Sequence, residues 1–259
     1  MTIRPLTDYR GIFAVDAVSY TQTPDADQPE LGAEIKSLVR NVFIDCGLAD
    51  VYPKTPQDCG DGVLFSVAHN WTSFLLQPVL VRLQQALEER NEMTPRYQPA
   101  LRLRVAVGLG LAPADVLASD AINRTCRLLN ADQIKDEMDC SDDRTTLVSA
   151  IVSDEVLQKV VGGGFSDLRP TEFRPVSATV QGKAFEEDAW IYTPRPSARE
   201  QAPGHDAVLE VAPKPSDEGV AGLSVNNAGA LIGQQNNNNT HQKISSPVIL
   251  PGVYPWNER

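Results

Sequence analysis

The chain has 259 residues, of which 42% are hydrophobic and 22% are charged, so its composition is that of a globular protein rather than a disordered one. Acidic residues outnumber basic residues by 34 to 23, which gives a net charge of -11. A chain this acidic is repelled by nucleic-acid backbones and by anionic membranes, so we expect neither as a partner.

No apolar run approaches the roughly 18 residues of a membrane span, and residues 1–8 lack the apolar core of a signal peptide. The 4 cysteines form no CxxC pair and only 3 histidines are present, which argues against a zinc site or a disulfide framework. We therefore expect a cytoplasmic protein.

The spacing of apolar residues predicts alternating strands and helices over residues 8–193. The predicted elements in chain order are a strand at 10–20, a helix around 35–46 that ends at Gly47, short strands near Val51 and at 63–68, a helix at 71–91 with a kink or a late start at Pro78, a strand at 101–108, a helix at 120–130, a strand at 145–152, a helix at 154–161, and strands near 173–180 and 189–192. The order β-α-β-β-α-β, followed by further helices and strands, predicts an α+β fold with a ferredoxin-like split βαβ sheet.

The composition changes near Pro194. Residues 194–224 are rich in proline and predict a linker that buries no core. Residues 225–259 contain the run Asn236–Asn239 after a short apolar segment, and this tail resembles the amyloid-like signalling motifs at the ends of some bacterial defence proteins. A flexible, solvated tail is the alternative interpretation.

Two aspartates stand out for their positions. Asp16 lies inside an apolar run, where a buried carboxylate needs a cation or a hydrogen-bond donor, unless it caps the following loop. Asp61 lies in the Gly60–Gly62 turn, which is also common hairpin chemistry. In a β-α-β arrangement the hairpin tip can lie beside the end of the first strand. Two carboxylates there would suit Mg²⁺ or Mn²⁺, which commonly shares its coordination with substrate phosphates.

Asn123 and Arg127 are four residues apart in a predicted helix and therefore share one face. An ordinary solvated surface pair has the same spacing. Beside a metal site, however, an arginine can bind the charge that develops on a phosphoryl group.

Together these segments resemble the class III nucleotide cyclases. Residues 13–21 (FAVDAVSYT) resemble the first metal motif, Gly60–Asp61 the second, residues 103–108 the strand that leads to the ribose-binding helix, and residues 120–128 that helix with its Asn-x-x-x-Arg. The motifs occur in the order and spacing of the family across residues 8–193.

The resemblance implies a head-to-tail homodimer with two shared active sites and a nucleoside triphosphate substrate. It implies two divalent metal ions, Mn²⁺ or Mg²⁺, held by Asp16 and Asp61 of one protomer with the carbonyl group of Ala17. The partner subunit would supply Asn123, which orients the ribose, and Arg127, which stabilises the transition state.

Three positions depart from the purine cyclases of this class. Gln57 stands four residues before Asp61, where those enzymes carry a base-selecting Lys or Glu, and Val116 stands where they carry the partner Asp or Cys. Gln181 replaces a phosphate-binding lysine of the family. Lys183 is a candidate substitute, with a plain surface lysine as the alternative.

Tyr52, nine residues before Asp61, is expected either to present an aromatic face to the base or to pack in the core. With Gln57 as a neutral base reader, the combination resembles the pyrimidine cyclases of bacterial Pycsar anti-phage systems. That resemblance implies cyclic UMP from UTP, or cyclic CMP from CTP, as a signal for a downstream effector protein. The alternatives are a purine (adenylate) cyclase with a diverged base pocket and a catalytically silent, cyclase-like dimeric scaffold.

Overall fold

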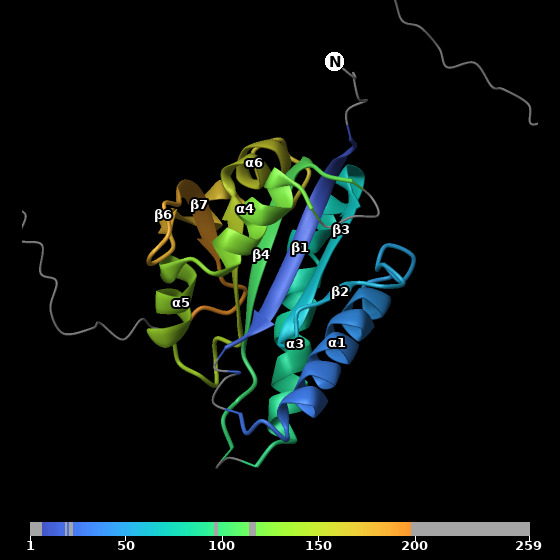
Figure 1. Cartoon of the computed structure of the whole chain (residues 1–259), viewed down its shortest axis with the longest axis vertical. Helices are drawn as coiled ribbons and strands as arrows, with labels where there is room; N and C mark the ends of the chain where they lie inside the picture. The colour runs from blue at the N-terminus through green and yellow to red at the C-terminus, as the bar shows by residue number, and fades with distance from the viewer. Residues whose placement is uncertain (1–6, 19, 21–22, 96–97, 114–117, 198–259) are drawn as a thin grey trace, which may run out of the picture. The chain divides into compact units, whose positions relative to one another are not determined.

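The computed structural model of the chain describes residues 7–197, apart from 19, 21–22, 96–97 and 114–117 (Figure 1). Val116, the linker beyond residue 197 and the predicted tail at 225–259 lie outside the described residues. Among the helices of the described residues, none is both long enough and apolar enough to cross a membrane.

The described residues form one seven-stranded sheet in the order β2-β3-β1-β4-β5-β7-β6. Its strands are β1 (Tyr9–Ala17), β2 (Gln57–Asp58), β3 (Gly62–Ala68), β4 (Leu103–Leu111), β5 (Val148–Ser153), β6 (Arg174–Thr179) and β7 (Glu186–Tyr192). Strand β1 lies between β3 and β4 and is antiparallel to both, as a split βαβ unit requires. The predicted ferredoxin-like arrangement is thus confirmed, and β5, β7 and β6 extend it on one side.

Helices cover both faces of the sheet. They are α1 (Gln28–Asp45), α2 (Thr72–Leu76), α3 (Val79–Glu92), α4 (Asp120–Leu129), α5 (Asp132–Asp139) and α6 (Asp154–Val156), with short 3₁₀ helices at His69–Trp71 and Pro170–Glu172 and a π-helical segment at Leu157–Val161. Phe13 and Val15 of β1 pack in a core cluster with α1, α2 and α3. Ile12 and Ala14, which alternate with them, pack in a second cluster with α4 and α5. We call the side of the sheet that packs against α1, α2 and α3 the α1 face, and the side that packs against α4 and α5 the α4 face.

The structure corrects one of the predicted elements and adds another. The segment around Val51 is a turn, and the short strand that pairs with β3 is β2. The helix predicted at 71–91 is interrupted at Pro78, where the sequence predicts a kink or a late start: Gln77 is extended, and α3 begins only at Val79 because a proline cannot donate the helical hydrogen bond. Helix α5 is not among the predicted elements; it is short and buries only Ile134 and Met138, which is a weak periodic signal.

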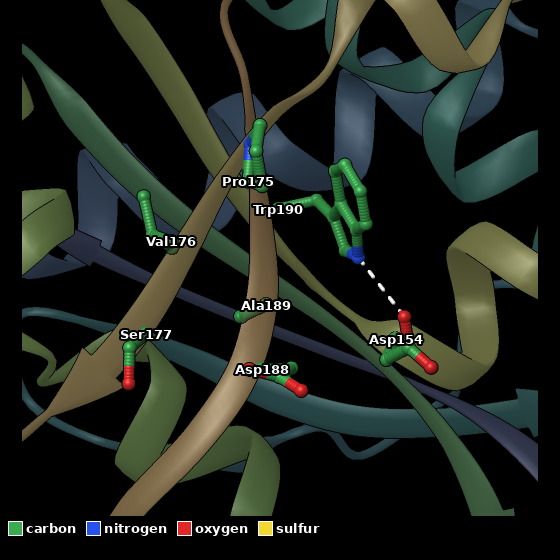
Figure 2. A pocket seen from close by; sticks show the side chains of 7 residues that line it. All are labelled: Asp154, Pro175, Val176, Ser177, Asp188, Ala189 and Trp190. Carbon is green, nitrogen blue, oxygen red and sulfur yellow. Dashed lines mark hydrogen bonds between the residues drawn. The ribbon is translucent and has the colours of Figure 1, made fainter.

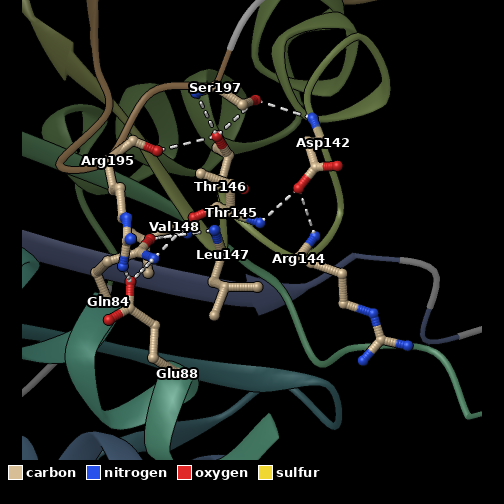
Figure 3. A network of polar contacts seen from close by, with 10 residues as sticks. All are labelled: Gln84, Glu88, Asp142, Arg144, Thr145, Thr146, Leu147, Val148, Arg195 and Ser197. Carbon is tan, nitrogen blue, oxygen red and sulfur yellow. Dashed lines mark hydrogen bonds and ion pairs between the residues drawn. The ribbon is translucent and has the colours of Figure 1, made fainter. Parts of the chain in front are cut away.

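The last described residues are bound to the body of the domain (Figure 3). The hydroxyl of Thr146 donates to the carbonyl oxygen of Arg195 and accepts from the backbone amide of Ser197, both at 3.0 Å. The Arg195 guanidinium pairs with Glu88 at 2.7 Å, and Glu88 accepts a hydrogen bond from Gln84. These contacts tie residues 195–197 to α3 and to the start of β5.

Candidate functional site

Asp16 stands near the end of β1, opposite Gly62 of β3 and Arg104 of β4. Only 7% of Asp16 is exposed, and both of its carboxylate oxygens accept hydrogen bonds from Arg104, at 2.9 and 2.8 Å. Burial raises the pKa of Asp16 to about 6, although the Arg104 charge and its hydrogen bonds lower it. The expectation that this carboxylate needs a cation or a donor is therefore met by a residue of the neighbouring strand.

Asp61 lies directly beside this pair. The Ala17 amide donates to the Asp61 carbonyl oxygen at 3.1 Å, and the Asp61 charge contributes to raising the pKa of Asp16. The approach of the two chain segments requires a glycine, since a Cβ on Gly62 would lie 1.8 Å from the carbonyl oxygen of Val15. Gly60 has φ +84°, in the left-handed region that suits glycine. The hairpin tip thus brings the two predicted carboxylates together.

The oxygen donors at this corner suit a hard divalent cation. Asp16, Asp61 and the carbonyl group of Ala17 offer two carboxylates and one neutral oxygen, and each Asp16 oxygen keeps a second lone pair beside its bond from Arg104. Among the described residues, no cluster of three or more His, Cys, Asp or Glu side chains is arranged to hold a metal. Two carboxylates and one carbonyl oxygen supply part of the octahedral shell that Mg²⁺ prefers, and phosphate or water oxygens can complete it.

A second group of predicted residues gathers on α4. Asn123 and Arg127 are exposed, and they line a hollow of about 340 Å³ together with Cys126, Asn130 and Lys183. The Arg127 guanidinium lies over the Phe185 ring, 5.6 Å from its centre. The structure therefore brings Lys183 to the same hollow as Asn123 and Arg127.

Helix α4 is held against the sheet by two local features. The Ser119 hydroxyl caps it by accepting from the Ile122 amide at 3.2 Å. Thr125 packs against Gly108 of β4, where an added Cβ would lie 2.0 Å from the Thr125 hydroxyl oxygen. This close packing leaves Asn123 and Arg127 on the exposed side of the helix. Within the described residues, no hydrogen bond or ion pair joins either of them to Asp16 or Asp61.

The two predicted base-binding residues lie on opposite faces of the sheet. Gln57 pairs in register with Leu64, whose side chain packs on the α4 face, so Gln57 lies on the same face as Asp16. Tyr52 packs on the α1 face, with its ring centre 5.3 Å from that of Phe43 and 5.1 Å from that of Phe65. The structure does not bring Tyr52 to the carboxylates.

Three further residues contact or influence the predicted site residues, and the sequence did not predict these contacts. Arg104 lies within a recognised motif, but its partner depends on strand pairing. Phe185 lies in the connection between β6 and β7, and its ring contacts the Arg127 guanidinium of α4. Lys135 of α5 has a charge that lowers the pKa of Asp16, which brings a further cation within electrostatic reach of the carboxylates.

A second hollow, along β6 and β7, differs from the one at α4 in the charge of its lining residues (Figure 2). It measures about 280 Å³ and is lined by Asp154 and Asp188 as well as Trp190, whose indole N–H donates to Asp154 at 3.1 Å. Its described lining holds two aspartates and no lysine or arginine, so its charge does not suit a phosphate-bearing ligand.

Neither a protein-family model nor a curated protein sequence matches the chain. Solved structures do. A bacterial light-regulated adenylyl cyclase matches with a TM-score of 0.50 and 12% identity over 77% of this chain and 55% of that one. An adenylate/guanylate cyclase/hydrolase from Silicibacter pomeroyi matches with a TM-score of 0.45 and 21% identity over 71% and 95% of the two chains. The guanylate cyclase domain of RhGC from Catenaria anguillulae, in complex with GTP, matches with a TM-score of 0.47 and 14% identity over 73% and 99%.

The match to the light-regulated cyclase bears on the fold. This chain spans about half the length of that enzyme. The mixed α+β architecture with its seven-stranded sheet matches the catalytic domain of class III nucleotide cyclases, as the sequence predicts. At these identities the similarity shows the fold alone.

Proposed function

We propose that this chain is a nucleotide cyclase, which converts a nucleoside triphosphate into its 3′,5′-cyclic monophosphate and pyrophosphate. The observation that carries the proposal is the meeting of Asp16 and Asp61 where β1 ends beside the β2–β3 hairpin. In a fold of the class III cyclase type, two carboxylates at this corner provide the donors for divalent cations and for a bound triphosphate.

The chemistry is an in-line displacement at phosphorus. The ribose 3′-oxygen forms a bond to the α-phosphorus, its proton passes to solvent, and the bond from the α-phosphorus to the bridging oxygen breaks to release pyrophosphate. Two divalent ions, Mg²⁺ or Mn²⁺, would lower the pKa of the 3′-hydroxyl group and neutralise the phosphate charge. Asp16, Asp61 and the Ala17 carbonyl would hold them.

We assign the remaining roles to residues of the α4 hollow. Asn123 would hold the ribose so that its 3′-oxygen faces the phosphorus, and Arg127 would bind the charge that develops on the α-phosphate. Lys183, in the same hollow, would bind the triphosphate. Because Asn123 and Arg127 are exposed and contact neither carboxylate in their own chain, we assign them to the site of a partner subunit in a homodimer.

For the base, we propose a pyrimidine, with UTP preferred and CTP second. Gln57 is exposed on the face that carries Asp16, and its neutral amide can donate to and accept from the edge of a uracil ring. The product would then be an anti-phage signal that acts on an effector protein. A purine cyclase remains the alternative, and a silent scaffold is disfavoured because both carboxylates are in place.

The experiment is to incubate the purified chain with each of the four ribonucleoside triphosphates and Mn²⁺, and to resolve the products by mass. We expect cyclic UMP as the main product, and none in the presence of EDTA. Cyclic AMP without cyclic UMP or cyclic CMP would refute the pyrimidine assignment and leave the cyclase assignment standing. No cyclic product from any of the four, with either Mn²⁺ or Mg²⁺, would refute both.

A further inference from the structure

Most arginines and lysines of the described residues are engaged by a carboxylate, a carbonyl oxygen or a hydroxyl group. Arg40 and Lys54 are exceptions: both are exposed, and within the described part of the chain neither makes an ion pair or a side-chain hydrogen bond. The chain has a net charge of -11 and many carboxylates, yet none of the described carboxylates pairs with either of these two cations. Both line the same hollow.

This hollow, which we call the α1 hollow, lies between α1 and the loop of residues 49–56. Its volume is about 460 Å³, within the roughly 300–1,000 Å³ of small-molecule sites. Its lining residues are Lys36, Ser37, Arg40, Ile44, Ala49, Tyr52, Pro53, Lys54 and Pro56. Three are cations and none is a carboxylate, while Tyr52, Ile44 and the two prolines supply aromatic and aliphatic surface.

The α1 hollow is separate from the candidate active site. None of Asp16, Asp61, Gln57, Asn123 or Arg127 lines it. Tyr52 reaches it from the core cluster of the α1 face, whereas Asp16 lies on the α4 face. The residue expected at the base-binding site therefore faces a different cavity.

From this lining we infer that the α1 hollow binds a small organic phosphate with a planar or apolar body. Arg40 and Lys54 would bind the phosphate, since both have unused donors and Arg presents a planar fork that matches phosphate oxygens. The Tyr52 ring and Ile44 would contact the body of the ligand. This site goes beyond the cyclase assignment, because it requires neither the carboxylates nor a metal.

The third cation connects the α1 hollow to the hairpin. Lys36 pairs with Asp58 of β2, and Asp58 also accepts a hydrogen bond from the Gly60 amide at 2.8 Å. A phosphate in the hollow therefore competes with Asp58 for Lys36. It follows that removing the Asp58 charge, while keeping an acceptor for Gly60, makes Lys36 available and tightens phosphate binding.

The test is calorimetric titration of the full chain with phenyl phosphate in EDTA, so that metal-dependent binding does not contribute. We expect saturable binding, tighter than that of inorganic phosphate. The variant Arg40→Gln/Lys54→Gln should bind at least about tenfold more weakly, as expected for losing charge-assisted contacts. The matched control Lys159→Gln/Arg169→Gln removes the same charge from two exposed residues that line neither the α1 hollow nor the α4 hollow, and it should bind like the unmodified chain.

A second pair of variants tests the role of Lys36. Asp58→Asn should tighten phenyl phosphate binding, whereas Asp136→Asn, the same charge change on exposed α5, should leave it unchanged. All the substituted side chains are at least partly exposed, and circular dichroism checks that each variant is folded. Absence of saturable binding to the unmodified chain, or equal weakening by the two double variants, would overturn the inference. Because no turnover is measured, failure here leaves the cyclase assignment untouched.

Discussion

At the scale of single residues, the pairing of Asp16 with Arg104 determines how the carboxylate behaves. The side chains of Asp16 and Arg104 are only 10% and 14% exposed, so water solvates neither charge well. Each charge is therefore compensated mainly by the other. Removing one partner of a buried pair is costly, because the other charge is left without compensation. Asp61 makes no such pair in the described residues, and its side chain is partly exposed.

We therefore predict that Asp16→Ala and Asp61→Ala differ in stability although both abolish cyclisation. Asp16→Ala should lower the free energy of unfolding by about 3 kcal/mol, as for a broken buried pair. Asp61→Ala should change it by less than about 0.5 kcal/mol, as for most surface substitutions. Urea denaturation measures both values. Equal free energies of unfolding for the two variants would mean that burying Arg104 without Asp16 carries no cost.

The double variant Asp16→Ala/Arg104→Ala supplies the control for this comparison. If Arg104 is destabilising only because it has lost its partner, removing it should recover part of the loss. The double variant should then be more stable than the sum of the two single effects predicts. Strict additivity would show that the two residues act independently.

A second prediction at this scale concerns Tyr52, whose ring contacts Phe43 and Phe65 in the α1-face cluster. Tyr52→Ala should lower the free energy of unfolding by about 2 kcal/mol, less than a fully buried aromatic residue because the ring is only half-buried. Tyr52→Phe keeps the ring and should be nearly neutral. Thermal melts compare the two. A large loss of UTP turnover in a fully stable Tyr52→Ala protein would instead favour a role at the base.

At the scale of elements, helix α4 is positioned by its contact with β4. Thr125 donates to the Ala121 carbonyl oxygen at 2.8 Å and fills the space above Gly108. We predict that Gly108→Ala moves α4 outward, because the new methyl group overlaps the Thr125 hydroxyl. The expected cost is about 1–3 kcal/mol, typical of overpacking. Turnover should fall as well, because Asn123 and Arg127 move with the helix.

Thr125→Ala in the Gly108→Ala background should relieve this overlap. The nearest remaining atom is the Cβ of residue 125, 3.1 Å from the position of the new methyl group, which a small shift accommodates. The double variant should therefore be more stable and more active than Gly108→Ala alone. If the second substitution only adds to the damage, steric overlap is not the cause.

At the scale of the whole molecule, the proposed site is divided between two copies of the chain. We predict that Asp61→Ala and Arg127→Ala proteins, each inactive alone, regain activity when mixed, because a heterodimer contains one intact site. With random exchange of subunits, about one quarter of the original sites would be intact. Cyclic nucleotide production after equilibration measures the recovery. The matched control mixes Asp61→Ala with Asp16→Asn, which affect the same half of the site and should restore nothing.

Features that depend on neighbours in the chain could be predicted from the sequence. The strand containing Asp16, the Gly60–Gly62 turn and the helix face shared by Asn123 and Arg127 follow from periodicity and turn chemistry. The order of these elements was sufficient to predict the split βαβ sheet, since right-handed, short connections leave few ways of pairing four strands.

Other features were decided only by the tertiary structure, because they join residues far apart in the chain. Arg104 lies 88 positions from Asp16 and meets it through the register of β1 against β4. The face on which Tyr52 packs depends on which aromatic rings α1 and β3 bring together. A one-residue change of register would move every side chain of a strand to the other face, and local sequence does not specify that pairing. The carboxylates could therefore be identified from the sequence, but not the cation that Asp16 contacts.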